Sequence, residues 1–557
     1  PCAAMQQSIE LADGAETDIV FMLGQGADLK TSQALIARYR DADIEALLKQ
    51  ASDRWDDMLH KVQVSTPDRR MDLLLNRWLP YQVLSCRVNA RTAFFQASGA
   101  WGFRDQLQDV MALCLTQPQV TRTHLLRCAA HQFVEGDVLH WWLPPGGAGV
   151  RTRIVDDRLW LPYAVAHYVT VTGDTDILDE DIAFLEAPQL KPEQVDSFSA
   201  PKTSAQTGSL FEHCARALEV SLSTGEHGLP LFGTGDWNDG MNRVGKDGRG
   251  ESVWMGWFLH TALTDFSPFA DSRGEHERAK SWRDHAAALA HALDQHAWDG
   301  DWWKRGWYDD GSELGSANND ECKIDTIAQS WAVMSGAADG QRAARAMQSV
   351  ERMAVDHDAR LIALFTPGFD DSPKDPGYIK GYPPGLRENG GQYTHGVIWS
   401  VIAFALLRDG DKASELFNLL NPISHAQDAA SVARYQSEPY VTCGDVYTAP
   451  GHVGRGGWSW YSGSAGWLYR AALEWILGLR VRGTQLHLVP CIPKNWPGFA
   501  IEFRHLSARY QITVENPNQV YCGIVRAELD GEPLAPPAHA IDLVDDGATH
   551  KVHITLG

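Results

Sequence analysis

The apolar residues of this chain recur every three to four positions over most of its length, and this period predicts amphipathic α-helices. Between residues 67 and 480, such segments alternate with loops rich in glycine and proline. We count about twelve, at residues 70–90, 104–117, 120–134, 157–171, 209–223, 252–265, 276–297, 323–336, 340–356, 395–408, 411–420 and 464–479. This number suits helical hairpins closed into a ring, an (α/α)6 toroid with largely apolar inner helices and long loops on one rim.

Both ends of the chain differ from this helical region, because apolar and polar residues alternate there with period two. Residues 481–557 hold short alternating runs between turn residues, which predicts a C-terminal β-sandwich. Residues 1–30 hold two such runs, which we interpret as the last strands of an N-terminal β-sandwich whose beginning is absent, and residues 31–66 predict a helical linker. We therefore expect a mainly α fragment of a larger polypeptide, with a toroid at residues 67–480 between flanking β-domains.

The composition limits which partners the chain can bind and which cellular compartment suits it. The chain has 49 Lys and Arg against 71 Asp and Glu, a net charge of −22 that repels nucleic acid. Its nine cysteines form no Cys-x-x-Cys pair, which favours reduced thiols in a cytoplasmic compartment and argues against structural zinc. No run of about 18 apolar residues is present in the sequence, so we expect no direct membrane contact in this segment.

One loop concentrates polar chemistry. Residues 233–242 read Gly-Thr-Gly-Asp-Trp-Asn-Asp-Gly-Met-Asn. Asp236 and Asp239 can supply a proton or accept sugar hydroxyls, and Trp237 can lie against the apolar face of a pyranose ring. The alternative is a turn whose side chains only satisfy their own backbone. The density of polar groups favours a sugar site, because functional residues concentrate in loops on a rigid scaffold.

This loop, together with Gly-Glu-Ser-Val-Trp at residues 250–254, resembles the catalytic loop of the inverting β-glucoside phosphorylases of glycoside hydrolase family 94. The form is most similar to that in the C-terminal part of cyclic β-1,2-glucan synthases. Other segments match in the family's order and span nearly the whole chain, at residues 1–5, 101–109, 149–154, 156–157, 319–322, 378–395 and 454–467.

The resemblance implies a reaction and its substrates. Phosphate attacks the anomeric carbon of a β-glucoside while one carboxylic acid protonates the leaving oxygen, which gives α-glucose 1-phosphate. The implied partners are β-1,2-glucan or an oligosaccharide and inorganic phosphate as co-substrate, with neither cofactor nor metal. As part of a synthase, the chain would work on the cytoplasmic side of the inner membrane, and members of the family are often homodimers.

Three other functions stay open at this stage. The chain can be a stand-alone phosphorylase for another β-glucoside. It can be an inverting hydrolase, which needs a second carboxylate about 6.5–9.5 Å from the first to activate water, and Glu388 or Glu438 would supply it. It can also be a glucan-binding module without catalysis.

The resemblance assigns roles residue by residue. Asp239 matches the general acid, a role that requires a pKa raised by burial or by a neighbouring carboxylate such as Asp236. The sugar-binding matches are Arg104, Asp109, Trp237 and Glu388, and Asp236 joins them by its place in the loop. The phosphate-binding matches are Arg91, with Arg87 as second choice, His395, Ser462 and Gly463, the last two just before a helix start that suits an anion.

One segment departs from the family pattern. After Glu438-Pro-Tyr-Val441 the disaccharide phosphorylases carry a glutamine, whereas this chain reads Thr-Cys-Gly-Asp at residues 442–445. The departure argues against cellobiose-type specificity and agrees better with the β-1,2-glucan branch.

Overall fold

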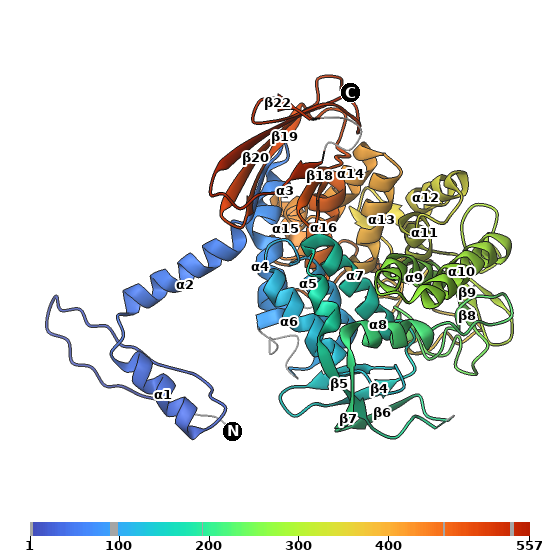
Figure 1. Cartoon of the computed structure of the whole chain (residues 1–557), viewed down its shortest axis with the longest axis horizontal. Helices are drawn as coiled ribbons and strands as arrows, with labels where there is room; N and C mark the ends of the chain where they lie inside the picture. The colour runs from blue at the N-terminus through green and yellow to red at the C-terminus, as the bar shows by residue number, and fades with distance from the viewer. Residues whose placement is uncertain (1–3, 90–98, 192, 461–462, 535–539) are drawn as a thin grey trace. The chain divides into compact units, whose positions relative to one another are not determined.

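The computed structural model describes residues 4–89, 99–191, 193–460, 463–534 and 540–557. The chain divides into two compact units, Pro1–Met58 and Leu59–Gly557. In the first unit, residues 4–28 form a long loop that is followed by two helices, α1 (Leu29–Arg40) and α2 (Ile44–Leu59) (Figure 1). Asp28 caps α1, because its carboxylate accepts a hydrogen bond from the backbone N–H of Thr31 at 2.6 Å.

The strands that we predict within residues 1–30 are not formed in residues 4–28. A strand needs a neighbouring strand to satisfy its backbone N–H and C=O groups, and the part of the chain that the structure describes pairs no strand with this segment. Its assignment to a β-sandwich therefore stays a prediction.

The second unit is built around a closed series of helices. Each contacts the next and the last contacts the first, in the order α5 (Phe103–Met111), α7 (Trp160–Thr172), α9 (Val253–Ser272), α11 (Thr326–Met334), α13 (Thr394–Leu406) and α16 (Ser464–Arg470). These helices are apolar on most sides; α13, for example, is buried from Thr394 to Ala405. A helix that is apolar all round lies inside a protein, so this series forms an inner ring.

A second set of helices packs against the ring from outside. It comprises α4 (Leu79–Val83), α6 (Pro118–Ala129), α8 (Leu210–Glu219), α10 (His276–Ala292), α12 (Gly340–Ala354) and α14 (Gly410–Leu420), each in contact with one or two ring helices. They are amphipathic, as expected for an outer layer; in α12 the buried face includes Ala343, Met347 and Val350. Every range predicted as helical between residues 67 and 480 overlaps a helix of the described chain, and the mainly α prediction is confirmed. The additional helix α15 (Ala429–Tyr435) and the short α3 (Arg69–Leu73) complete the set in the described residues.

Tryptophans fill the middle of the ring. Trp160, Trp254, Trp331, Trp399 and Trp467 come from α7, α9, α11, α13 and α16, and all are fully buried. Their rings meet mostly edge to face, with centroids 5.3 Å apart between Trp331 and Trp399 and 5.6 Å apart between Trp399 and Trp467. Such pairs add stabilisation beyond the buried area, so much of the high tryptophan content serves packing.

Short strands fix the start of several ring helices. β2 (Trp101–Gly102), β8 (Glu251–Ser252), β11 (Ile324–Asp325) and β15 (Gln392–Tyr393) each end where α5, α9, α11 and α13 begin. Their antiparallel partners are β3 (Leu139–Leu143), β9 (Gly306–Trp307), β14 (Phe365–Thr366) and β16 (Asp445–Val446). The starts of these helices are therefore held at one rim by backbone hydrogen bonds.

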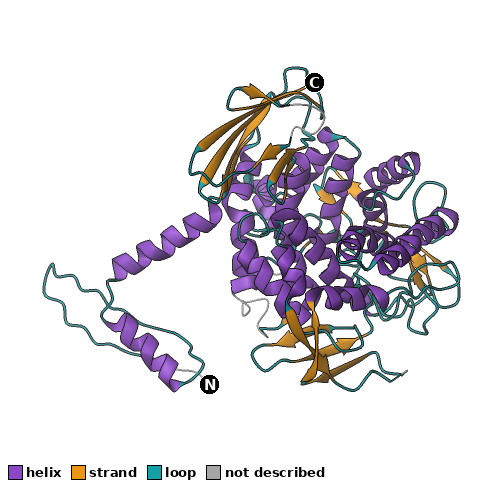
Figure 2. Ribbon diagram, viewed as in Figure 1, coloured by secondary structure: helices purple, strands orange, loops and turns teal. Residues whose placement is uncertain are grey.

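The C-terminal residues form two sheets (Figure 2). The larger has the order β1-β19-β20-β24-β21-β22, with β1 (Val62–Ser65), β19 (Gly498–His505), β20 (Ala508–Glu515), β24 (Thr549–Leu556), β21 (Ile524–Leu529) and β22 (Glu532–Pro533). Burial alternates at every residue of β20, as the period-two pattern predicts. The smaller sheet has the order β17-β18-β23, with β17 (Leu479–Arg482), β18 (Gln485–Leu488) and β23 (Ile541–Asp542). β1 is a strand inside the segment that we predict as a helical linker.

Two further sheets lie near the ring. β3 continues through β4 (Ala148–Thr152) to β6 (Asp196–Ser199) in a four-stranded sheet that begins with β2. β5 (Asp181–Glu186) pairs with β7 (Lys202–Ser209). The first of these sheets matters for the site, because β3 carries a histidine toward the start of α5.

Candidate functional site

The predicted site residues that the structure describes gather at the rim where the ring helices begin. Arg104 lies in the first turn of α5 and His395 in the first turn of α13. Asp239 lies in a loop ahead of α9, in the short 3-10 helix Asp239–Met241. Because helix starts carry positive partial charge, a rim built from several of them suits a negatively charged ligand.

Arg104 joins the loop that carries Asp239 to the buried carboxylate of Asp156. Its Nη2 donates a hydrogen bond to Oδ1 of Asp239, and its Nη1 donates to Oδ1 of Asp156 at 2.7 Å and to the backbone oxygen of Asp236 at 3.0 Å. The Asp239 side chain keeps 30% of its surface exposed, whereas that of Asp156 is fully buried. Asp239 is therefore the carboxylate of this group that a substrate can reach.

His140 of β3 lies on the other side of Asp239. Its Nδ1 is 2.8 Å from Oδ2 of Asp157, and its Nε2 is 3.5 Å from Oδ2 of Asp239. Sequence reasoning missed this residue, because a single histidine in an apolar strand carries no motif. Only its pairing through β2 and β3 with the start of α5 indicates a place in the site.

The charges in this group set the protonation of Asp239. Burial raises its pKa, but the Arg104 guanidinium and His140 outweigh burial, so the pKa of Asp239 lies below its usual range. Burial lowers the pKa of His140, but Asp157 and Asp239 outweigh it and hold that pKa well above its usual range. The raised pKa that a general acid requires is thus absent at Asp239 itself, and the proton of the Asp239–His140 pair lies on the imidazole.

Asp236 makes side-chain contacts inside the protein, and its sugar contact stays a prediction. Its side chain is fully buried, its Oδ1 accepts from Nη2 of Arg305 at 2.6 Å, and its Oδ2 accepts from the hydroxyl of Ser252 at 2.7 Å. Arg305 also donates to Asp325 at 2.9 Å. With both oxygens engaged away from solvent, Asp236 anchors the loop that carries Asp239.

Trp237 and His395 pack against each other beside this loop. Their ring centroids are 5.6 Å apart, and Trp237 is 6% exposed. The Oε1 of Gln108 lies 2.7 Å from Nε2 of His395 and accepts the indole N–H of Trp467 at 3.0 Å. Because that oxygen can only accept, Nε2 of His395 carries its hydrogen. Gln108 therefore fixes the orientation of the imidazole.

The remaining sugar-binding predictions fall on two different elements. Asp109 is buried on α5, next to the backbone of α16 at Gly466. Glu388 keeps 17% of its side chain exposed and lies 3.3 Å from Nε of Arg387. Burial raises the pKa of Glu388, and the charges of Asp239 and Asp445 raise it further against the effect of Arg387. A second carboxylate thus shares the electrostatic environment of Asp239.

Two of the predicted phosphate ligands, Arg91 and Ser462, lie outside the described residues. Gly463 is the N-cap of α16. The segment that departs from the family pattern lies beside it: the hydroxyl of Thr442 is 2.8 Å from that of Ser464, and Gln82 of α4 accepts from Thr442 at 2.9 Å and 3.0 Å. Thr442 therefore links Gln82 of α4 to the start of α16.

The part of the chain that the structure describes holds neither a candidate metal site nor a candidate membrane span. Its His, Cys, Asp and Glu side chains form no group of three or more that could hold a metal ion. Within the same residues, no helix combines the length and the apolar character that crossing a bilayer requires.

Family models match both units of the chain. The model described as the glycosyl hydrolase 94 superfamily, catalytic domain, matches residues 54–478. The model described as the glycosyl hydrolase 94, supersandwich domain, matches residues 1–42.

Two curated relatives and one solved structure are similar to the chain. Cyclic beta-(1,2)-glucan synthase NdvB of Rhizobium meliloti (strain 1021) is 49% identical over 514 residues, 92% of this chain and 18% of that protein. Solabiose phosphorylase of Paenibacillus borealis is 29% identical over 504 residues, 90% of this chain and 61% of that protein. A GH78 family rhamnosidase of Bacillus sp. GL1 aligns over 89% of this chain and 44% of its own, with a TM-score of 0.50 and 13% identity, which is a likeness of fold alone. The chain thus spans only part of each relative.

Proposed function

Because the chain belongs to the glycosyl hydrolase 94 superfamily, we propose that it catalyses inverting phosphorolysis of β-glucosidic bonds in β-1,2-glucan or its oligosaccharides and releases α-glucose 1-phosphate. At the coarser level it is an enzyme of the glycosyltransferase type, since its relatives are glycoside phosphorylases and a glucan synthase. The similarity to the synthase supports the finer proposal that the chain is a cytoplasmic module of a larger cyclic β-1,2-glucan synthase. The same proposal includes a homodimer.

One observation carries the proposal. The partly exposed carboxylate of Asp239 lies at a rim of helix starts, where Arg104 and His140 supply positive charge. His395, in the first turn of α13, is oriented by Gln108, to which its Nε2 donates, and packs on Trp237 of the loop that carries Asp239. A phosphate dianion and a carboxylate can be neighbours only where such dipoles and cations outweigh their repulsion.

The chemistry follows from this arrangement. A phosphate oxygen forms a bond to the anomeric carbon as the bond from that carbon to the glycosidic oxygen breaks. The leaving oxygen takes a proton that the Asp239–His140 pair holds, with Asp239 as the group that faces the sugar. The charge of the bound phosphate raises the pKa of Asp239 and so favours its protonated form, which is the form that can donate to the leaving oxygen.

We propose two finer points of architecture as well. The closed series of inner helices with its outer layer supports an (α/α)6 toroid, with residues 67–480 as its limits. The proposed sugar-binding residues are Arg104, Asp109, Asp236, Trp237 and Glu388, and the proposed phosphate-binding residues are Arg91, His395, Ser462 and Gly463.

A second candidate function, inverting hydrolysis, is favoured by Glu388. This carboxylate interacts electrostatically with Asp239 and keeps part of its side chain exposed. A hydrolase needs such a second group as the base that activates water. The raised pKa of Glu388 opposes that role, because a base must be ionised.

The deciding experiment uses linear β-1,2-glucan with the full 557-residue chain. Reactions with and without inorganic phosphate are compared, and the released sugar is identified by chromatography and ³¹P NMR. Phosphorolysis predicts α-glucose 1-phosphate that appears only with phosphate. Free glucose released at the same rate without phosphate would establish the hydrolase.

A further inference from the structure

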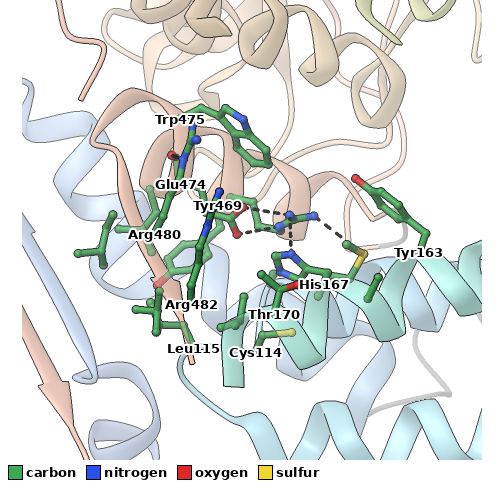
Figure 3. A pocket seen from close by; sticks show the side chains of 18 of the residues that line it. Cys114, Leu115, Tyr163, His167, Thr170, Tyr469, Glu474, Trp475, Arg480 and Arg482 are labelled. Atoms are coloured by element: carbon green, nitrogen blue, oxygen red, sulfur yellow. Dashed lines mark hydrogen bonds and ion pairs between the residues drawn. The ribbon is translucent and has the colours of Figure 1, made fainter. Parts of the chain in front are cut away.

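A cavity of about 290 Å³ lies at the opposite end of the ring from the catalytic loop. It is lined by the C-terminal parts of α5, α7 and α16, by the π-helix Ala471–Ile476 and by β17 (Figure 3). The catalytic residues precede or open the ring helices, whereas this cavity reaches Thr170 near the end of α7. Along α7, Trp160 and Thr170 are about 15 Å apart, so the cavity is a separate site.

Two charged side chains in the wall of the cavity already neutralise each other. Arg470 donates from Nε and Nη2 to the two carboxylate oxygens of Glu474 at 2.8 Å and 3.0 Å. His167 lies 3.5 Å from the same guanidinium, and burial together with Arg470 lowers the pKa of His167 to about 4. At neutral pH this group is therefore an ion pair beside a neutral imidazole and requires no ligand.

Three other charged groups of the wall lack such partners. Asp265 of α9 makes no ion pair or side-chain hydrogen bond among the described residues. Arg482 of β17 likewise has none among them. Arg480 donates from Nε to the backbone oxygen of Glu474 at 2.9 Å, which leaves its terminal nitrogens unused within the described chain. Like charge at Arg482 adds to burial in lowering the pKa of Arg480.

The unused groups are separated across the cavity. Asp265 comes from α9 and the two arginines from β17, and α7 contacts both elements. In Figure 3, Arg480 and Arg482 lie on one side of the view and Tyr163 on the other. Tyr163 lies within electrostatic reach of Asp265. The cavity therefore offers paired guanidiniums at one end and a carboxylate with a phenol at the other.

The two ends of the cavity suit different parts of one ligand. Adjacent guanidiniums match the oxygens of a phosphate group. A carboxylate and a phenol match the hydroxyls of a sugar, since a carboxylate only accepts. The C-terminal end of α5 carries negative partial charge, which also favours hydroxyl donors over an anion in the middle of the cavity. The volume lies at the small end of ligand pockets, about 300–1,000 Å³, which suits a single sugar unit.

We propose that this cavity is a second binding site, for a phosphorylated monosaccharide. The phosphate group lies against Arg480 and Arg482, and the sugar hydroxyls donate to Asp265. The site does not depend on the catalytic assignment, because none of its lining residues belongs to the catalytic rim.

The test measures binding without turnover. Isothermal titration calorimetry is run on the full chain carrying Asp239→Asn, with glucose 6-phosphate, glucose 1-phosphate, inorganic phosphate and glucose as separate probes at fixed ionic strength. We expect saturable binding of at least one sugar phosphate, about tenfold or more tighter than that of either phosphate or glucose alone. Equal affinity for inorganic phosphate, equal affinity for glucose, or no saturable binding of a sugar phosphate overturns the proposal.

Matched variants locate the site. Arg482→Glu should weaken sugar phosphate binding about tenfold or more, whereas Arg509→Glu, the same charge change at an exposed position of β20, should leave it unchanged. Asp265→Asn should weaken the same binding by a smaller factor. His395→Ala, which weakens phosphate binding at the catalytic rim, should leave unchanged the sugar phosphate binding that depends on Arg482. Loss of that binding in His395→Ala, or equal loss in both glutamate variants, would assign the signal to the catalytic rim or to net charge and overturn the proposal.

Discussion

Nε2 of His140 lies 3.5 Å from Oδ2 of Asp239, and the two side chains come from β3 and from the loop ahead of α9. Asp157 fixes the far side of the imidazole at 2.8 Å. In this pair the pKa of the histidine is raised and that of the aspartate is lowered, for the same reason. The pair thus holds one proton over a wide pH range, and the titration belongs to both groups together.

Replacing His140 with Gln should move the alkaline limb of the pH–rate profile toward acid. Activity that needs this proton is present below the upper pKa of the pair and is lost as pH rises through it. Without His140, the proton must reside on Asp239, whose pKa Arg104 still holds low. The measurement is kcat against pH at saturating phosphate and glucan. Glutamine keeps an amide donor toward Asp157, so a uniform loss of rate with an unshifted limb would mean that His140 only positions its neighbours.

Asp239→Asn should abolish phosphorolysis of natural glucans while the protein stays folded. The carboxamide keeps the shape but cannot pass on a proton, a loss of roughly 10²–10⁴ in rate. The measurement is glucose 1-phosphate release beside a circular dichroism spectrum. Asp247→Asn, an exposed position of the same loop region, is the matched control and should retain activity. Near-normal turnover of Asp239→Asn would move the acid to another carboxylate, with Glu388 the first to test.

The helices of the ring and the residues of continuous motifs could be predicted from the sequence, because both depend on residues that are near one another in the chain. Helical periodicity identified the ring segments, and the motif residues Arg104, Trp237, Asp239 and His395 lie at one rim. The resemblance assigned the acid to Asp239 and sugar binding to Asp236, but the sequence did not show which of the two side chains is buried. Arg305, 69 residues away, buries one of them and leaves the other exposed.

The features that could not be predicted from the sequence depend on contacts between distant segments. Residues 62–65 read as linker, yet they form β1 because β19, more than 400 residues later, offers a free edge. Gln108 and His140 carry no motif, and their roles follow only from contacts with His395 and Asp239. A single sequence without tertiary contacts gives no sign of such pairs.

His395→Ala should raise the phosphate Michaelis constant far more than that of the glucan. The imidazole lies at the start of α13, and one hydrogen bond to a charged group contributes about 1.5–3 kcal/mol, which corresponds to roughly 10–100-fold. Steady-state kinetics with each substrate varied in turn measures both constants. Gln108→Leu, which removes the acceptor that orients the imidazole, should shift the same constant by a smaller factor. A larger change in the glucan constant would reassign His395 to the sugar.

His213→Gln should reduce the loss of stability at low pH. His213 is fully buried, stacks on Phe184 at 3.9 Å, and burial lowers its pKa to about 4. Below pH 6.5 the unfolded chain takes up a proton that the folded chain refuses, so stability falls as pH falls from 6.5 to about 4, by on the order of 3 kcal/mol from this residue. Thermal unfolding at pH 7 and pH 4.5 should show a smaller difference for the variant than for the natural chain. Equal differences would mean that His213 is protonated in the folded state.

Gly377→Ala should lower kcat although Gly377 is not in the catalytic loop. Its φ of 122° lies in the region that favours glycine, and a Cβ there would come 2.1 Å from Oδ1 of Asn242 and 2.6 Å from the backbone oxygen of Gly240. The side chain of Asn242 also accepts the backbone N–H of Tyr378 at 3.1 Å.

The new methyl group must therefore push the turn that carries Asp239, and a shift of about 1 Å can cost roughly 10²-fold in rate. Gly248→Ala is the control, because that residue also has a positive φ, +79°, but nothing lies within 4 Å of its Cβ. Both variants should lose about 1–3 kcal/mol of stability to backbone strain, while only Gly377→Ala should lose most of its kcat. If the two variants lose kcat equally, the contact between residue 377 and the turn does not position Asp239.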